Sequence, residues 1–397
     1  MIIKPSIRSN IFTNAHPFGC KAFVEHQIKE AKALEPFNGP KNVLIIGGSS
    51  GYGLSTRIAL AVGANANTIN VSFESAPKGK RTGTAGWWNN IYFQELTREF
   101  GSKHKDFVGD AFSSEMKQQV IDYVKNEFGK LDLIIYSLAA GARRDETTNE
   151  IVRSHIKTLG EAAIGKTIDV ASHEIKDLTV TEANEQEVKE TVFVMGGSDW
   201  HNWIQRFDAE NLLNEGVKTI SYTYIGGPTT ETIYRGGTLG KAKEDLEEKA
   251  RLMDGLFKEK YNGEALISSS KAVVTKASVF IPQMPIYVSC LYDVMMRHSI
   301  HESILEHKYR LFKDMIYGNN RITDDKNRIR LDHLEMQEFV QSETVELMKK
   351  LSNEALFELE GTKEFFNEFY KIHGFGFDSI DYKKDVDLDK LSELEPK

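Results

Sequence analysis

A tyrosine and a lysine in the second half of the sequence could act together in a reduction. Tyr234 lies just before a Gly-Gly turn, and Lys243 follows after eight intervening residues on a predicted helix. When hydride adds to a carbon conjugated with a carbonyl group, a phenol can stabilise the charge arriving at oxygen and pass on a proton. A nearby ammonium can bind a cofactor and favour the phenolate. Tyr224, ten residues earlier, could reach the same oxygen, although packing is the alternative role for both tyrosines.

Histidine and cysteine do not indicate a metal site in this sequence. His298 and His301 stand three apart with Glu302 beside them, but no third ligand at a supporting spacing accompanies them. Cys20 and Cys290 are far apart and lack the spacing of a disulfide framework or a zinc site. We therefore predict no bound metal and a reducing, cytoplasmic environment.

A glycine-rich turn could hold a dinucleotide beside these groups. Gly47, Gly51 and Gly53 lie directly between a predicted buried strand, 42–46, and a predicted helix, 54–62. Glycines at such positions permit a tight turn and let a pyrophosphate approach the N–H groups at a helix N-terminus. A purely structural loop is the alternative. The turn residues predicted to bind the cofactor are Gly47, Gly48, Ser49, Ser50, Gly51 and Tyr52.

Glu74 indicates which dinucleotide is bound. It follows Gly53 by 21 residues and ends the second predicted strand, 68–73. A carboxylate there can accept hydrogen bonds from the adenosine ribose hydroxyls of NAD, and it repels a 2′-phosphate. The prediction is therefore NADH rather than NADPH, with an ordinary solvated acid as the alternative. Topology alone places two further pairs near the cofactor, although an aspartate before a helix is more often an N-cap. These pairs are Asp110 with Ala111 and Leu138 with Ala139.

The elements that would position these groups alternate along the first half of the chain. Apolar runs at 42–46, 68–73 and 131–136 read as strands of a parallel sheet, and residues with helical spacing separate them. This alternation predicts an α/β protein with a Rossmann-type, doubly wound parallel sheet. We expect one enlarged catalytic domain over 1–397, with a polar insertion at 142–215 and a mainly helical C-terminal portion at 290–397.

Composition excludes two classes of partner. The net charge of -8 over 397 residues argues against nucleic-acid binding, which needs a surplus of Lys and Arg on one face. The most apolar stretch, 277–296, is interrupted by Pro282, Pro285 and Asp293, so it predicts buried core and no stable membrane insertion. Pro5 precedes any apolar segment that could serve as a secretory signal.

Ordered motifs along nearly the whole chain carry a family resemblance. They are Ile3-Lys4-Pro5, Asn14-Ala15-His16-Pro17, the turn 47–53, Phe73-Glu74, Gly86-Trp87, Gly109-Asp110-Ala111, Tyr136-Ser137-Leu138-Ala139, Met195-Gly196-Gly197, Tyr234 with Lys243, Lys271-Ala272-Val273-Val274-Thr275 and Gly374-Phe375-Gly376. In these motifs the sequence resembles the FabV class of enoyl-acyl carrier protein reductases and the related trans-2-enoyl-CoA reductases. One departure is Ala140-Gly141, where a Ser-Pro pair is expected, and the glycine should loosen that turn.

The resemblance implies an enlarged short-chain dehydrogenase-like, monomeric enzyme. It would use NADH to reduce the 2,3 double bond of trans-2-enoyl thioesters, carried by CoA or acyl carrier protein, in fatty acid synthesis. Tyr234 would donate the proton, Tyr224 would contact the substrate and Lys243 would bind NAD. The resemblance also implies cofactor contacts at Phe73, Glu74, Asp110, Ala111, Leu138, Ala139, Val273, Val274 and Thr275.

Two other functions stay open at this point. A short-chain-type, NAD-dependent carbonyl reductase or dehydrogenase could use the same phenol to protonate an alkoxide. A protein that only senses NAD would bind NADH without turning anything over. The sequence does not distinguish CoA from carrier protein, and it does not set the length of the acyl chain.

Overall fold

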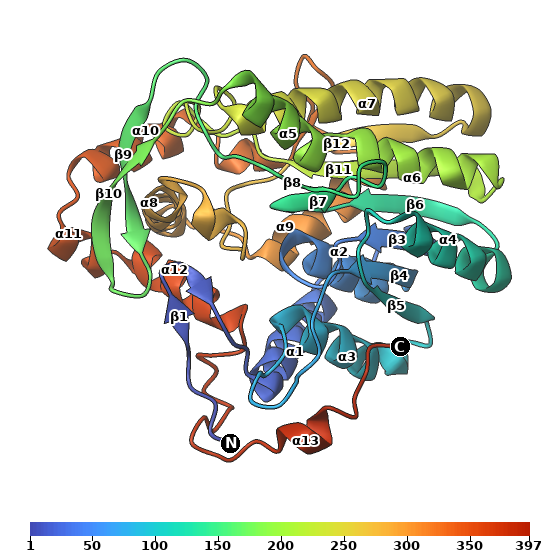
Figure 1. Ribbon diagram of the computed structural model, residues 1–397, viewed down its shortest axis with the longest axis horizontal. Helices are drawn as coiled ribbons and strands as arrows, with labels where there is room; N and C mark the ends of the chain where they lie inside the picture. The colour runs from blue at the N-terminus through green and yellow to red at the C-terminus, as the bar shows by residue number, and fades with distance from the viewer.

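A seven-stranded sheet forms the centre of the computed structural model, which describes residues 1–397 (Figure 1). Its strand order is β13-β12-β11-β6-β3-β4-β5, and all neighbouring strands are parallel. The strands are β3 (Asn42–Ile46), β4 (Asn67–Ser72), β5 (His104–Val108), β6 (Leu131–Tyr136), β11 (Leu213–Thr223), β12 (Glu264–Ser269) and β13 (Ile329–Arg330). The predicted Rossmann-type sheet is confirmed. Because the order reverses between β3 and β6, the carboxyl ends of these strands mark the expected ligand-binding edge.

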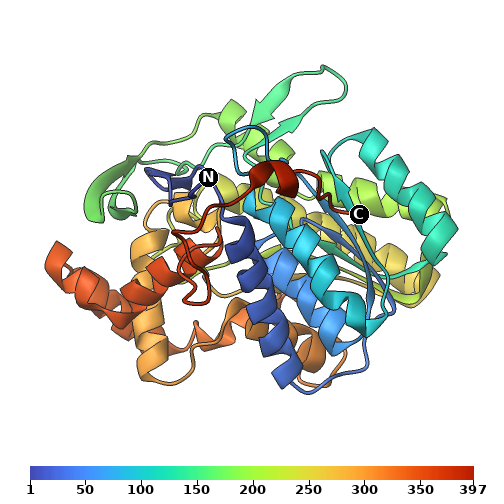
Figure 2. The same ribbon diagram turned by 90° about the horizontal axis from the view of Figure 1, so that it is seen from below.

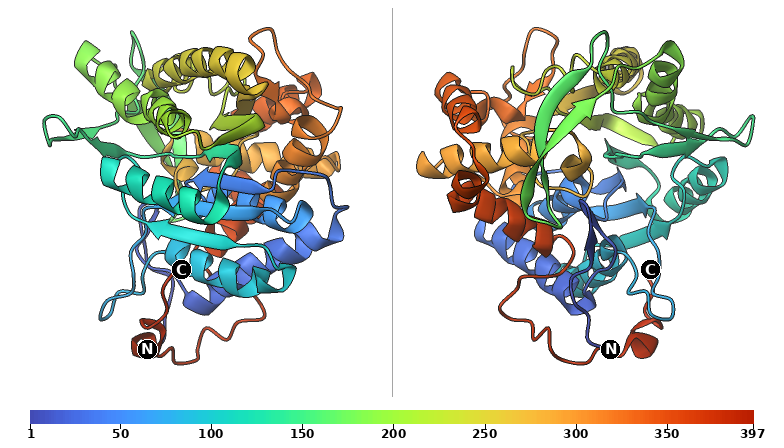
Figure 3. Two further views of the ribbon diagram at one scale, coloured as in Figure 1. Left: turned by 90° about the vertical axis from the view of Figure 1, so that its right-hand side faces the viewer. Right: turned by 60° about the vertical axis from the view of Figure 1, so that its left-hand side comes forward.

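Helices cover both faces of this sheet, as the views from below and from the side show (Figures 2 and 3). Alternate residues of β3 enter different cores: Leu44 and Ile46 pack toward one set of helices, and Val43 and Ile45 toward the other. One face carries α4 (Ser114–Tyr123), α6 (Ser198–Ala209) and α7 (Thr238–Tyr261). The other carries α1 (Pro17–Ala33), α2 (Gly51–Gly63), α3 (Ala85–Thr97) and α9 (Ile304–Arg310).

Two boundaries differ from those expected in ways that matter for the site. The helix after the glycine turn begins at Gly51 rather than at residue 54, so Gly51 and Tyr52 belong to its first turn. The second strand ends at Ser72, which leaves Phe73 and Glu74 just beyond the sheet.

Antiparallel hairpins occupy much of the stretch between β6 and α6. They pair β7 (Ala142–Arg144) with β8 (Ile151–Arg153) and β9 (Ala163–Asp169) with β10 (Glu174–Val180). Helix α5 (Glu185–Met195) follows and packs on α7, whereas α6 belongs to the main core. The second hairpin lies beside α8 (Met284–Arg297), in front of it in Figure 1. The division of the chain at 142–215 stays a prediction.

A second core surrounds α8 and draws on both the middle and the end of the chain. It is formed with α10 (Glu338–Lys349), α11 (Asn353–Glu358) and α12 (Glu360–Lys371). Shorter elements are β1 (Ile7–Arg8), β2 (Ile11–Phe12) and α13 (Leu388–Leu391), with helical turns at Arg98–Phe100, Val124–Phe128, Ser278–Phe280, Leu311–Ile316 and Leu331–Leu334. No helix combines the length and apolar character needed to cross a membrane.

Candidate active site

The glycine turn is held in one tight conformation between β3 and α2. A Cβ on Gly47 would lie 2.3 Å from the Ser137 carbonyl oxygen, and one on Gly53 would lie 1.9 Å from the Gly47 carbonyl oxygen. Gly47 also has φ of 95°, a left-handed value that glycine adopts without strain. The Gly48 N–H donates to Asn70 Oδ1 at 2.8 Å, so this amide fixes the turn and is not free for a phosphate.

The N-terminus of α2 leaves donors available for an anion. Its N-cap, Ser50, makes no side-chain hydrogen bond to the helix, so the first N–H groups have no side-chain acceptor. Such groups and the helix dipole favour a phosphate at this position. Nearby, Asn89 donates to the Ser49 carbonyl oxygen at 3.0 Å, but its buried Oδ1 has no hydrogen-bond partner. The free N–H groups and the helix dipole fit the pyrophosphate of a dinucleotide, whereas the Asn89 oxygen, an acceptor, fits a hydroxyl group of the ligand.

Glu74 is fixed at the end of β4 beside this turn. Its Oε1 accepts a hydrogen bond from Ser49 Oγ at 2.6 Å. It also lies against Gly86, where a Cβ would stand only 1.9 Å from Glu74 Oε1. The preceding Phe73 side chain is 80% exposed, an unusual position for a phenylalanine and one that offers a flat apolar face. A carboxylate and an exposed ring together suit an adenosine.

The other residues predicted from topology follow the neighbouring strands. Asp110 comes two residues after β5, and its Oδ1 accepts the Phe112 N–H at 2.9 Å, which makes it a turn residue. The N-cap of α4 is Ser113, not Asp110. Leu138 and Ala139 follow β6; Leu138 is half-buried and Ala139 is exposed. These residues and the glycine turn therefore share one edge of the sheet.

Two tyrosines meet beside α7. The rings of Tyr224 and Tyr234 lie with centroids 4.6 Å apart at an angle of 71°. Burial raises the pKa of Tyr234, and the Glu335 carboxylate adds to that rise, so the phenol stays protonated near neutral pH. Lys243, in the second turn of α7, is half-buried. Burial lowers the pKa of its ammonium to about 8, Arg235 contributes in the same direction and Glu247 opposes it.

A strap of chain at 271–275 runs past both the glycine turn and the tyrosines. Val273 and Val274 are buried and Thr275 is half-buried. A Cβ on Gly51 would lie 3.2 Å from Thr275 Cγ2, so the strap crosses close to the start of α2. The Tyr52 hydroxyl donates to the Lys271 carbonyl oxygen at 2.5 Å. Burial raises the pKa of Tyr52 and Tyr234 adds to that effect, which places the two phenols in one electrostatic environment.

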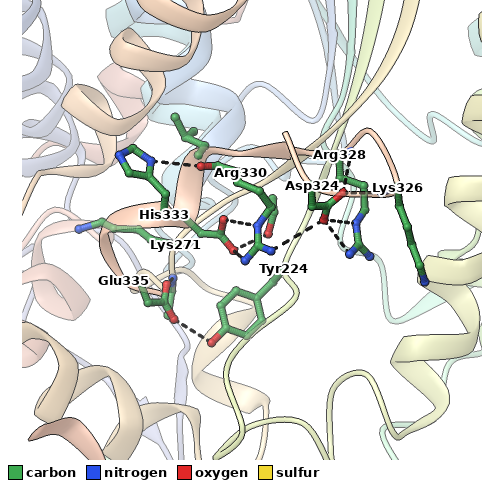
Figure 4. A network of polar contacts seen from close by, with 12 residues as sticks. Tyr224, Lys271, Asp324, Lys326, Arg328, Arg330, His333 and Glu335 are labelled. Carbon is green, nitrogen blue, oxygen red and sulfur yellow. Dashed lines mark hydrogen bonds and ion pairs between the residues drawn. The ribbon is translucent and has the colours of Figure 1, made fainter. Parts of the chain in front are cut away.

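Glu335 is the residue at this site that sequence reasoning missed. It is 0% exposed, and its Oε1 accepts from the Tyr224 hydroxyl at 3.0 Å (Figure 4). Burial raises its pKa to about 7. The residue belongs to a polar stretch among the many acids of the C-terminal portion, and no spacing or motif distinguishes it there. Its partner lies 111 residues earlier, so no local pattern could have connected the two.

Three family models match consecutive parts of the chain. Residues 2–79 match the NAD(P)H binding domain of trans-2-enoyl-CoA reductase, and residues 81–317 match the trans-2-enoyl-CoA reductase catalytic region. Residues 323–386 match a model described as an enoyl reductase FAD binding domain.

The segment 323–386 does not form a cradle for a flavin dinucleotide. Its strand β13 is two residues long, and no glycine-rich turn joins it to a helix. The glycines Gly361 and Gly374 are packed against the chain itself. A Cβ on Gly361 would lie 2.2 Å from the Asp293 backbone N, and one on Gly374 would lie 2.4 Å from the His16 backbone O. These glycines therefore serve packing, and the segment does not fit the flavin of that description.

Relatives match from end to end. Trans-2-enoyl-CoA reductase [NADH] of Clostridium acetobutylicum is 44% identical over 100% of both chains, and enoyl-[acyl-carrier-protein] reductase [NADH] 2 of Photobacterium profundum is 42% identical over 99% of this chain and 100% of its own. The crystal structure of the Clostridium acetobutylicum enzyme in complex with NADH superposes with a TM-score of 0.97, covering 100% of both chains at 44% identity. The crystal structure of Treponema denticola trans-2-enoyl-CoA reductase in complex with NAD superposes with a TM-score of 0.91 at 42% identity, covering 97% of this chain and 98% of its own. The chain therefore belongs to the trans-2-enoyl-CoA reductase family, as the ordered motifs of its sequence indicate.

Proposed function

We propose that this chain uses NADH to reduce the 2,3 double bond of trans-2-enoyl thioesters carried by CoA or acyl carrier protein, as a step of fatty acid synthesis. The observation that carries the proposal is the contact of Tyr224, at the carboxyl end of β11, with Tyr234, which precedes the helix that carries Lys243. The glycine turn lies at the same edge of the sheet. Relatives named for both carriers, enoyl-CoA and enoyl-acyl carrier protein, support the substrate class.

The cofactor-binding half of the site would hold NADH along the carboxyl edge of the sheet. The cofactor supplies the hydride when it is bound. Glu74 would accept the adenosine ribose hydroxyls and Phe73 would face the adenine. Lys243 would bind the nicotinamide ribose or the pyrophosphate. The proposed contacts are Gly47, Gly48, Ser49, Ser50, Gly51, Tyr52, Phe73, Glu74, Asp110, Ala111, Leu138, Ala139, Lys243, Val273, Val274 and Thr275.

The catalytic half would act on the thioester oxygen. Because its pKa is raised, Tyr234 enters the reaction with its proton and donates a hydrogen bond where negative charge develops. Tyr224 would contact the same thioester group. A charged Lys243 stabilises the phenolate that forms if the Tyr234 proton is transferred. The burial of these groups strengthens each interaction, since it keeps competing water away.

A turnover assay tests this proposal. Purified protein, NADH and a short trans-2-enoyl-CoA should give loss of nicotinamide absorbance together with a saturated thioester. A panel of enoyl-CoA and enoyl-carrier substrates of graded length ranks the carriers. An alcohol product would instead support the carbonyl reductase alternative, and absence of turnover with every enoyl thioester would reject the proposal.

We further propose that the enzyme is a cytoplasmic monomer folded as one catalytic domain. The two cysteines, Cys20 and Cys290, are buried and unpaired, which suits a reducing compartment. Light scattering on the purified protein, expected to give a mass near 44.9 kDa, tests the monomer.

A further inference from the structure

We infer that Glu335 is a positioning residue for this reduction, because its carboxylate ties the substrate-side tyrosine to the cofactor-side strap and holds the neighbouring phenols as hydrogen-bond donors. The inference rests on the proposed function. It also assigns a task to the segment 323–386, which does not fit a flavin.

Every contact of the Glu335 carboxylate is with a donor. Oε1 accepts from the hydroxyls of Tyr224 at 3.0 Å and Tyr287 at 2.7 Å, and Oε2 accepts from the Ala272 N–H at 2.7 Å. Gln341 Nε2 donates to the Tyr287 oxygen at 2.9 Å, which commits the Tyr287 proton to Glu335. An ionised carboxylate accepts all three bonds, whereas a protonated one would have to donate at one oxygen.

These contacts link two parts of the site that belong to different elements. Tyr224 follows β11 and packs edge-on against Tyr234. Ala272 belongs to the strap that carries Thr275 past the start of α2. Loss of the carboxylate would release the Tyr224 hydroxyl and the Ala272 N–H of the strap, while the backbone elements on either side stay packed.

The charge of Glu335 acts on the phenols around it. It raises the pKa of Tyr234, as it does for Tyr224, Tyr287 and Tyr52. Lys271 from the strap and Asp332 from its own turn are the other charged groups that interact with it. Since burial raises the pKa of Glu335 to about 7, its charge is lost as the pH falls through neutrality.

Ion pairs brace the segment that carries Glu335 (Figure 4). Arg330 pairs with Asp332 at 2.8 Å, and Asp332 also accepts from Ser269 on β12 at 2.8 Å. Farther along, Arg328 pairs with Asp324 at 2.7 Å and with Glu247 on α7 at 3.0 Å. Glu247 pairs in turn with Arg235, the residue after Tyr234. These ion pairs anchor the segment to α7, which carries Lys243, and through Glu247 to the loop that carries Tyr234.

Glu335→Gln in the full chain tests the inference through the pH profile of kcat/KM for an enoyl-CoA. In the wild type, kcat/KM should rise as the pH increases through about 7, where Glu335 becomes charged. The variant should lose this rise and should be about 10-fold to 100-fold less active near pH 8, since bonds to a charged acceptor contribute roughly 1.5–3 kcal/mol. Glu335→Asp should keep part of the rise, because it keeps the charge.

Glu368→Gln is the matched control. Glu368 is a half-buried carboxyl whose pKa is also raised to about 7, but its hydroxyl partner is Tyr292, at 2.8 Å, rather than Tyr224. This control should keep the rise near pH 7. A wild type without that rise, or a Glu335→Gln profile that still shows it, would overturn the inference.

If Glu335→Gln does not fold, the pH profile of kcat/KM for Tyr287→Phe tests the role of Glu335 instead. The Tyr287 hydroxyl lowers the pKa of Glu335, so its removal should move the rise to higher pH, whereas an unmoved rise would contradict the inference. Failure of the proposed function can be told apart from failure of this inference, because the wild type would then turn over no enoyl thioester at any pH.

Discussion

NADH binding is expected to weaken as the pH rises through about 8, because Lys243 then loses its charge. Burial is the largest cause of its lowered pKa of about 8, and Arg235 adds to it while Glu247 opposes it. If only the charged form binds tightly, the dissociation constant doubles near the pKa and is about tenfold higher one pH unit above it. The weakening should level off at about 10-fold to 100-fold, because a hydrogen bond from a charged donor contributes roughly 1.5–3 kcal/mol.

Fluorescence titration of the protein with NADH, from about pH 6 to pH 10, measures this dependence. Lys243→Arg should abolish it, since a guanidinium keeps its charge throughout this range. Glu247→Gln should move the weakening to lower pH, because the carboxylate that raises the pKa of Lys243 is removed. The same pH dependence in wild type and Lys243→Arg would refute the assignment of the titrating group.

Three further substitutions test other parts of the site. Tyr234→Phe should lower kcat by about 10²-fold to 10⁴-fold while NADH affinity stays within about threefold, and near-normal kcat would remove Tyr234 from the mechanism. Glu74→Ala should weaken NADH binding by about tenfold and reduce the ratio of kcat/KM for NADH over NADPH, whereas an unchanged ratio would contradict its role in selecting the cofactor. Gly53→Ala should cost roughly 1–3 kcal/mol of stability in a thermal or denaturant melt, because its Cβ would lie 1.9 Å from the Gly47 carbonyl oxygen. Gly255→Ala, in an open position on α7, is the control and should not destabilise the protein.

Local pattern in the sequence was sufficient for three strands of the sheet and for the glycine turn, whereas β12 and β13 were not predicted. The strands predicted at 42–46 and 131–136 are present with those bounds as β3 and β6, because continuous apolar runs of that length are buried on both sides. The turn between β3 and α2 also follows from local rules, since backbone contacts at Gly47 and Gly53 leave no room for a side chain. The start of α2 was placed three residues too late, and the second strand one residue too late.

Family membership was likewise readable from ordered motifs, but their chemical partners were not. The contact between Tyr224 and Tyr234 joins residues that are close in sequence, so spacing alone could suggest it. The engagement of the Gly48 N–H by Asn70 depends on how neighbouring strands align, and residue type does not encode that hydrogen bond. The bond from the Phe112 N–H to Asp110, by contrast, is local, because aspartate side chains commonly accept from the backbone two residues later.

The sequence by itself indicated the parallel sheet and the dinucleotide turn, because apolar periodicity and glycine requirements are local properties of a chain. The roles proposed for Tyr234 and Lys243 came instead from the order of motifs shared with the family. Only the tertiary structure decided that Glu335 would stand behind Tyr224. The second core around α8 brings the C-terminal portion against the strap. Burial there raises the pKa of Glu335 to about 7, and three hydrogen-bond donors surround its carboxylate. Charge and hydrogen bonding in such a place depend on residues that meet only after folding.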